Sequence, residues 1–250
     1  MAEFPIVGID VSSYQGLMDW GLAKKQGITF AFIRAEYNLA KDKQFDRNWF
    51  EAKRNGIYRG AYGWVMGNPI SNVNQLNHAS FLWNIIKDDP GELPPVCDFE
   101  KALYGGGPST PAFGALQAYV LALEKLSGKK PMIYTSYGYW RQWSPFATQY
   151  WALSYPLWIA NYTTRPDPLV PAPFPTWNFW QWSAGGNGLG ESYGAQSGDI
   201  DLDRYNGDME SFKKFAGIET TPQPPSITLE SRVSKLEKWA ETKGYSYENY

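Results

Sequence analysis

The sequence has few of the residues that build disulfides and metal sites. Its 250 residues include one cysteine, Cys97, and one histidine, His78. A single cysteine cannot form an intramolecular disulfide, so the fold depends on packing. A single histidine excludes sites that need two imidazoles and makes a Ser-His-Asp triad depend on this residue alone. We expect Cys97 to be a small buried filler and His78, inside a predicted helix, to have a surface or packing role.

The sequence also lacks a strong charge of either sign and a long apolar run. Its formal net charge is -2 and it has no lysine or arginine run, so we expect no nucleic-acid partner. No segment is long and apolar enough to span a membrane, and we expect no membrane partner. Residues 1–8 lack the basic flank and apolar stretch of a signal peptide. If the protein acts outside a cell, another agent has to release it.

Short apolar runs alternate with amphipathic segments along the chain. The pattern predicts strands at residues 6–10, 29–37, 58–65, 94–100, 131–136, 157–162, 178–183 and 199–204. It predicts helices at residues 19–26, 46–55, 72–87, 109–126 and 208–215, with Asp46 as the N-cap of the second. Strands that alternate with helices indicate parallel βαβ units. We expect an α/β fold, an irregular (β/α)-barrel of about eight strands with helices missing in its second half. A doubly wound open sheet is the alternative.

Two carboxylates stand at alternate positions of the apolar run 94–100. Asp98 and Glu100 would share one face of a strand, with about 6.6 Å between their Cα atoms. Barrel enzymes gather their function where strands end, and Asp10 and Asp201 also fall near predicted strand ends. Two carboxyls with unequal pKa values are what glycoside hydrolases use to protonate a leaving oxygen and stabilise an oxocarbenium-like centre. The alternative is a set of strand-end acids that point into water.

Aromatic residues make up 17% of the chain, and many adjoin the predicted strand ends. Core packing accounts for a share of them. Flat amphipathic rings around acids also suit a cleft for sugars, because the rings offer apolar faces while acids and amides bind hydroxyls. The predicted substrate contacts are Tyr62, Trp64, Tyr134, Trp158 and Trp180, with Gln181 as a polar contact.

Neither a metal nor another cofactor is expected. Asp199, Asp201 and Asp203, with Glu210, imitate the ligand spacing of an EF-hand, but Arg204 occupies the position that must be glycine. The three aspartates fit better on one side of a strand. The glycine-rich segments at 105–107 and 185–188 lack the features of a P-loop or a Rossmann fingerprint.

Several segments, in the right order, resemble the family 25 glycoside hydrolases, the Chalaropsis-type lysozymes common among bacteriophage endolysins. These segments are Gly-Ile-Asp-Val-Ser-Ser-Tyr-Gln-Gly at 8–16, Val-Cys-Asp-Phe-Glu at 96–100, Pro-Met-Ile-Tyr-Thr at 131–135, Leu-Trp-Ile-Ala at 157–160, Phe-Trp-Gln-Trp at 179–182 and Asp-Leu-Asp at 201–203. The resemblance covers residues 6–215. It implies a flattened β/α-barrel muramidase that cleaves the β-1,4 bond between N-acetylmuramic acid and N-acetylglucosamine in peptidoglycan.

The resemblance also implies roles for single residues. Glu100 matches the general acid, and Asp98 matches the acid that steers the substrate's acetamido group or the water. Asp10 and Asp201 match the two flanking acids of the cleft. Tyr62 and Trp180 lie where the family has substrate-lining aromatics. The chain departs from the family at two places.

These departures lie on the second and third predicted strands. The family often has histidine after the tyrosine matched by Tyr62, where this chain has Gly63. The segment Ile-Arg-Ala-Glu at 33–36 also lacks the family's usual ending. Both departures bear on substrate contacts and not on the acids.

The expected mechanism gives the two paired acids different charge states. Glu100, desolvated by aromatic neighbours and repelled by Asp98, would hold its proton near neutral pH and donate it to the glycosidic oxygen. Asp98 would stay ionised. It would then stabilise an oxazolinium formed by the substrate's N-acetyl group, with retention, or activate water, with inversion. The alternative function is a non-catalytic glycan-binding or virion-associated structural module.

The chain ends in a segment that the resemblance does not cover. We expect a catalytic domain at 1–218, a proline-rich linker at 219–226 and a helical tail at 227–250. Leu229, Val233, Leu236 and Ala240 fall at a/d-like spacings, which indicates a helix for homo-oligomerisation or for docking a partner. A remnant of a wall-binding module is the alternative. Together with the missing signal peptide, the endolysin likeness suggests a protein held in the host cytoplasm until release onto the bacterial cell wall.

Overall fold

The computed structural model describes residues 5–64, 72–100, 110–143 and 149–218, together with residues 233, 234, 237, 238 and 242. The chain divides into two compact units, Met1–Ile218 and Glu219–Tyr250. The predicted linker and most of the predicted tail helix lie outside the described residues. The roles of catalytic domain, linker and docking tail therefore stay predictions.

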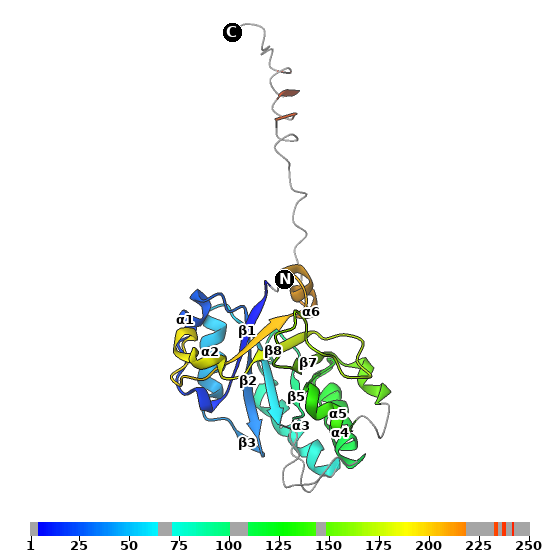
Figure 1. Ribbon diagram of the computed structural model, residues 1–250. Coiled ribbons are helices and arrows are strands. Elements are labelled where there is room, and N and C mark those ends of the chain that lie inside the picture. Colours follow the sequence, from blue (N-terminus) through cyan, green and yellow to red (C-terminus); the bar gives the residue numbers. More distant parts are fainter. Residues whose placement is uncertain are drawn as a thin grey trace. The chain divides into compact units, whose positions relative to one another are not determined.

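Eight strands of the first unit close into a barrel (Figure 1). In order around the barrel they are β1 (Val7–Val11), β2 (Phe30–Tyr37), β4 (Tyr58–Trp64), β5 (Val96–Asp98), β6 (Met132–Ser136), β7 (Leu157–Ala160), β8 (Phe179–Ser183) and β9 (Asp201–Tyr205), which pairs with β1. The predicted barrel is confirmed, and the open sheet is wrong. The short β3 (Ala40–Lys41) forms a hairpin with β2 outside the ring.

The last strand of the barrel runs against the others. Strands β1 to β8 pair in parallel around the ring, whereas β9 is antiparallel to both β8 and β1. The expected repeat of parallel βαβ units therefore stops at β8. The 3₁₀ turns η3 (Gly185–Gly188) and η4 (Gly190–Tyr193) lie in the connection from β8 to β9, where no crossover helix returns the chain to the other end of the barrel.

The three longest helices, α2 (Phe45–Arg54), α3 (Asn72–Ile86) and α4 (Thr110–Ser127), all precede β6, as the sequence predicts. The short α1 (Trp20–Lys25) precedes β2, and α3 packs against α4 (Figure 1). The second half holds α5 (Tyr137–Trp143), which was not predicted, the 3₁₀ turn η2 (Tyr150–Ser154) and α6 (Met209–Phe215). Asp46 is not the N-cap of α2, because that helix starts one residue earlier and its N-cap is Gln44. No helix among the described residues is apolar over a length that would cross a membrane.

Two apolar layers lie on either side of the strands. The inner layer fills the barrel with rings such as Phe32 and Trp158, which stack with centroids 4.2 Å apart. The outer layer packs the strands against the helices and contains Cys97, which is buried as predicted. Because both faces of each strand are covered, alternate residues of one strand serve different layers.

Two buried side chains, Arg59 and His78, link strands to the outer layer through contacts with acids. Arg59, fully buried at the start of β4, bonds to Asp89 at 2.9 Å and to Glu92 at 2.8 Å. His78 of α3 is also buried, and its Nδ1 lies 2.7 Å from Glu36 Oε1. His78 thus has the packing role, and not the surface role, of the two that the sequence allowed.

Candidate active site

A cavity of about 210 Å³ opens at the end of the barrel where the parallel strands finish. All four predicted acids, Asp10, Asp98, Glu100 and Asp201, line this cavity. Five of the six predicted contact residues line it as well, namely Tyr62, Trp64, Tyr134, Trp158 and Gln181. The fold therefore brings together residues that are as far apart in the sequence as Asp10 and Asp201.

The direction of β9 explains why Asp201 reaches this end of the barrel. Asp201 is the first residue of β9, and Asp10 lies near the end of β1. Because the two strands are antiparallel, the start of β9 lies beside the end of β1, and Asp10 and Asp201 are direct partners in the register. Because β9 is antiparallel, the carboxylate at its start lies at the end of the barrel where the parallel strands finish.

Gln181 connects the acids with two tyrosines. Its Nε2 donates to Asp10 Oδ2 at 2.7 Å and to Asp201 Oδ2 at 3.5 Å. Its Oε1 accepts from the hydroxyls of Tyr134 at 2.9 Å and Tyr162 at 2.6 Å. Since all four hydrogen-bonding positions of the amide are used and the side chain is buried, Gln181 positions the acids rather than offering free groups to a sugar.

Asp203 is a buried acid that the predicted site left out. It is fully buried two residues after Asp201, and its Oδ1 accepts a hydrogen bond from Trp158 Nε1 at 2.8 Å. The alternation that placed Asp201 and Asp203 on one side of a strand was the signal that pointed to it. Asp199, the third aspartate of that pattern, lies before β9 and is exposed.

Burial raises the pKa values of the acids on this side of the cavity. The pKa of Asp10 is raised well above its usual value by burial first and then by the charges of Asp201 and Asp203, against the hydrogen bond from Gln181. Burial likewise raises the pKa of Asp203, while the Trp158 hydrogen bond lowers it. Such clustered carboxyls favour retained protons, which is typical of catalytic sites.

Asp98 differs from the expectation that it is the ionised partner of the pair. The side chain points into the barrel and is only 5% exposed, and its Oδ1 has no hydrogen-bond partner. Burial raises the pKa of Asp98 well above its usual value, the charge of Glu100 raises it further, and Arg34 lowers it. Burial therefore favours the neutral form of Asp98, and Glu100 lies half-buried at the mouth of the cavity.

The glycosyl hydrolases family 25 model matches residues 9–190, which include all of these acids except Asp201 and Asp203. The chain belongs to this family. Lysozyme M1 from Streptomyces globisporus is 32% identical over 211 residues, which are 81% of this chain and 68% of that protein.

Solved structures agree with the family assignment. The bacterial lysozyme from Streptomyces coelicolor matches with a TM-score of 0.71 and 28% identity, over 84% of this chain and 96% of that one. The catalytic domain of endolysin ply40 from bacteriophage P40 of Listeria monocytogenes has a TM-score of 0.65 over 87% of this chain and all of that domain. At 16% identity this second likeness shows the fold alone. The barrel of this chain is the family 25 barrel, and the chain is a glycoside hydrolase.

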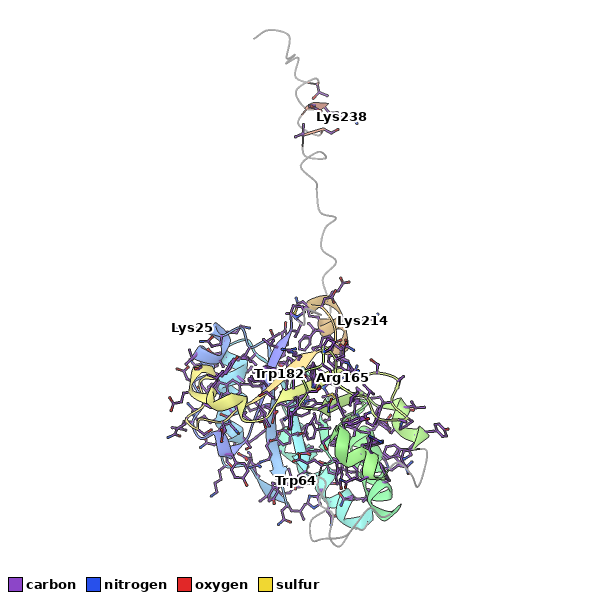
Figure 2. The ribbon with its side chains drawn as sticks, viewed as in Figure 1. Lys25, Trp64, Arg165, Trp182, Lys214 and Lys238 are labelled. Atoms are coloured by element: carbon purple, nitrogen blue, oxygen red, sulfur yellow. The ribbon has the colours of Figure 1, made fainter. Side chains whose placement is uncertain are left out.

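Trp180 does not lie in the cavity of this family 25 enzyme, and its predicted contact with substrate is corrected. In β8, Phe179 and Gln181 face the barrel interior, so Trp180 between them faces the outer layer. It is 2% exposed, and its Nε1 donates to the backbone oxygen of Asn161 at 2.8 Å. Trp64, labelled in Figure 2, ends β4 and does line the cavity.

The structure also accounts for the family departure at Gly63. A Cβ at this position would lie 2.6 Å from the hydroxyl oxygen of Tyr119 and 3.0 Å from Glu36 Oε2. A histidine cannot occupy the same place while these two side chains stay where they are. The departures at 33–36 and at Gly63 are therefore linked, because the Glu36 carboxylate fills the space beside the glycine.

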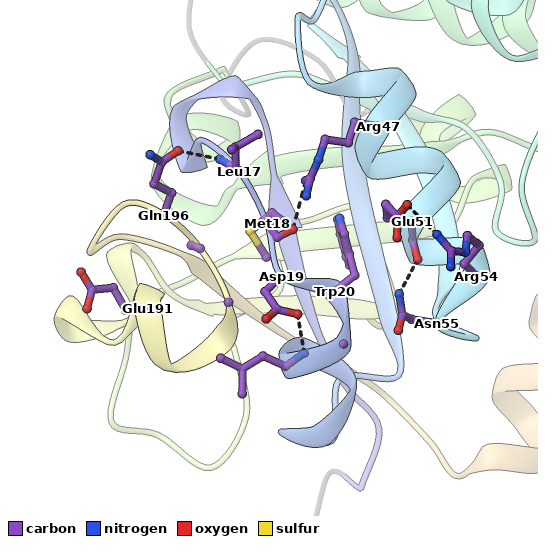
Figure 3. A pocket seen from close by; sticks show the side chains of 14 residues that line it. Leu17, Met18, Asp19, Trp20, Arg47, Glu51, Arg54, Asn55, Glu191 and Gln196 are labelled. Atoms are coloured by element: carbon purple, nitrogen blue, oxygen red, sulfur yellow. Dashed lines mark hydrogen bonds and ion pairs between the residues drawn. The ribbon is translucent and has the colours of Figure 1, made fainter.

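A larger hollow of about 660 Å³ lies outside the barrel, between α1, α2 and η4 (Figure 3). Both of its arginines have partners: Arg47 donates to the backbone oxygen of Met18 at 3.0 Å, and Arg54 pairs with Glu51 at 3.1 Å. None of the buried acids lines it. The smaller cavity in the barrel mouth is therefore the candidate active site.

Proposed function

We propose that the chain is a peptidoglycan muramidase that hydrolyses the β-1,4 bond between N-acetylmuramic acid and N-acetylglucosamine. Family 25 membership and the lysozyme relatives support this activity. The observation that carries the assignment to particular residues is the meeting of Asp10, Asp98, Glu100 and Asp201 in one aromatic-walled cavity. Two strand-end acids would arise easily by chance, whereas four that converge from both ends of the domain fit glycosidic-bond cleavage.

Glu100 is the general acid in this proposal. It lies at the half-buried mouth, where a glycosidic oxygen can reach it, whereas Asp98 lies deeper. In this proposal the pair shares one proton, which burial favours on Asp98 before the sugar binds. A bound sugar expels water from the mouth and desolvates Glu100 as well, so that the proton is available there for the leaving oxygen.

The other acids and rings have supporting roles. Asp98, once ionised, stabilises the positive charge that develops on the substrate or activates the attacking water. Asp10 and Asp201 bind sugar hydroxyl or amide groups from the opposite wall, and Gln181 holds both of them in place. Tyr62, Trp64, Tyr134 and Trp158 supply the apolar surfaces of the cavity.

Substitution of Glu100 by glutamine tests this assignment. The variant keeps the shape of the side chain and loses the proton donor, so we expect cell-wall clearing to fall by about 10² to 10⁴. Glu210→Gln, on the exposed first turn of α6, is the matched control and should clear walls like the wild type. Near-normal clearing by Glu100→Gln rules out its role.

Product analysis separates the proposed function from its alternative. Mass spectrometry of the digest should show new reducing ends on N-acetylmuramic acid, and NMR of the first-formed anomer distinguishes retention from inversion. A wild-type protein that binds glycan strands without cleaving them would instead be the non-catalytic module.

The tail carries a separate proposal. We propose that residues 227–250 mediate self-association or docking of a partner while the protein acts on the bacterial cell wall. The a/d-like spacing of its apolar residues supports this role. Size-exclusion chromatography of the full chain and of a chain ending at Ile218 tests it. The same number of subunits in both particles, with no change in wall clearing, would count against it.

A further inference from the structure

Tyr14 is an aromatic side chain that the proposed mechanism does not use. It lines the acid cavity, yet it is 78% exposed, more than any other large hydrophobic side chain among the described residues. Single exposed apolar residues are ordinary on protein surfaces. Tyr14 differs because it stands at the rim of a polar cavity and because its surroundings hold it in place.

The segment that carries Tyr14 is tied down on two sides. Tyr14 lies in the 3₁₀ turn η1 (Ser13–Gln15), which a capping box between Ser12 and Gln15 closes. On one side, Asp42 accepts a hydrogen bond from the Ser13 backbone at 3.0 Å. On the other side, the Gln15 backbone oxygen accepts from the backbone of Gln196 at 3.0 Å. The ring is thus mounted on a rigid base, so that ordering it on binding costs little entropy.

A guanidinium group orients the ring. The Arg34 guanidinium lies over Tyr14, 5.0 Å from the ring centroid, and 5.5 Å from the centroid of Tyr37. Asp42 holds Arg34 through its Nε at 2.9 Å, and Ser13 Oγ accepts from Arg34 Nη2 at 3.1 Å. Because Arg34 occupies one face of the Tyr14 ring, the high exposure belongs to the other face.

We propose that the free face of Tyr14 is a stacking platform for a pyranose ring of the glycan strand, outside the two sugars joined by the cleaved bond. A pyranose offers an apolar C–H face to the ring and leaves its hydroxyls for water and for the polar rim, which matches the amphipathic character of tyrosine. Tyr14 lines the same cavity as Glu100 but is far more exposed, so a sugar stacked on it lies at the open rim, and the proposal assigns it to a sugar beyond the reacting pair. This proposal rests on the proposed function only in that it takes the ligand to be a peptidoglycan strand.

Chain-length dependence tests this platform. We expect Tyr14→Ala to raise KM for peptidoglycan octasaccharides by about three- to tenfold, with kcat unchanged, because one aromatic contact is lost. A tetrasaccharide bound across the cleaved bond should lose at most twofold. Tyr14→Phe keeps the ring and should stay within twofold of the wild type on both substrates. Tyr150→Ala removes a ring of similar exposure that does not line the cavity and should change neither value.

Binding measurements make this test independent of catalysis. In the Glu100→Gln background, calorimetry should show the same three- to tenfold weaker binding of the octasaccharide when Tyr14 is alanine. If the wild type binds the octasaccharide without hydrolysing it, the muramidase proposal fails and the platform stands. If Tyr14→Ala binds and turns over long and short strands like the wild type, or loses kcat equally on both, the platform is overturned.

Discussion

Gln181→Met is the substitution that tests how the acids are held. Methionine keeps the length of the side chain and removes every hydrogen bond that the amide makes. Asp10 loses a donor at 2.7 Å, Asp201 loses a long and weak one at 3.5 Å, and the hydroxyls of Tyr134 and Tyr162 lose their acceptor. The three shorter bonds differ in cost because their partners differ in exposure.

The expected magnitude follows from that exposure. The bond to the Asp10 carboxyl contributes about 0.5–1.5 kcal/mol while Asp10 is protonated and about 1.5–3 kcal/mol once it is ionised. Tyr134 is buried, so its unpaired hydroxyl costs about 1–3 kcal/mol. Tyr162 is 57% exposed and can bond to water, so its contribution is small. Since both larger losses arise at one residue and are not fully additive, we expect the free energy of unfolding to fall by about 3–4 kcal/mol.

The loss should also depend on pH. The Gln181 hydrogen bond lowers the pKa of Asp10 against burial, so the methionine variant should have a still higher Asp10 pKa. A pKa raised in the folded state means that stability is full at low pH and is lost as pH rises through the folded pKa. The difference between variant and wild type should therefore be larger near neutral pH than in acid. The acidic limb of wall clearing should move to higher pH if the reaction needs ionised Asp10.

Urea unfolding at several pH values and a pH profile of wall clearing measure both effects. Gln26→Met, at the exposed C-cap of α1, is the matched control and should change the free energy of unfolding by less than about 0.5 kcal/mol. The reasoning is refuted if Gln181→Met matches this control, or if its loss of stability is the same in acid and at neutral pH.

Two further predictions concern buried charges. Arg59→Met removes ion pairs whose acidic partners, Asp89 and Glu92, are partly exposed and can bond to water instead, so denaturant unfolding should show a loss of about 1.5–3 kcal/mol; an unchanged midpoint would contradict this. Asp203→Asn keeps an acceptor for Trp158 and removes a carboxyl whose pKa is raised by burial. The wild type loses stability as pH rises through this pKa, and we expect the variant to keep that stability. Unfolding curves from pH 4 to 8 check this, and a variant less stable than the wild type at neutral pH would contradict it.

The order and type of most barrel elements could be predicted because each has a local signal. The acids could be predicted for a related reason: a carboxylate inside an apolar run, such as Asp98, is conspicuous in the sequence. The antiparallel direction of β9 could not be predicted, because the direction of a strand depends on whether a crossover helix precedes it. The short 3₁₀ turns before β9 leave no clear periodic pattern in the sequence. Helix α5 was missed since its seven residues follow β6 without an intervening turn.

It was harder to predict which residues of a strand face the barrel interior and which face the helices. Polar residues inside the strands indicate this best. Strand β8 is covered on both sides, so hydrophobicity alone does not show which way Trp180 points. Gln181 does show it, because this amide serves the acids in the barrel and its neighbours must face outward. The same argument applied to β2 would fail. A register shift between Arg34 and Glu36 breaks the alternation, so that Arg34 lines the cavity while Glu36 bonds to His78 in the outer layer.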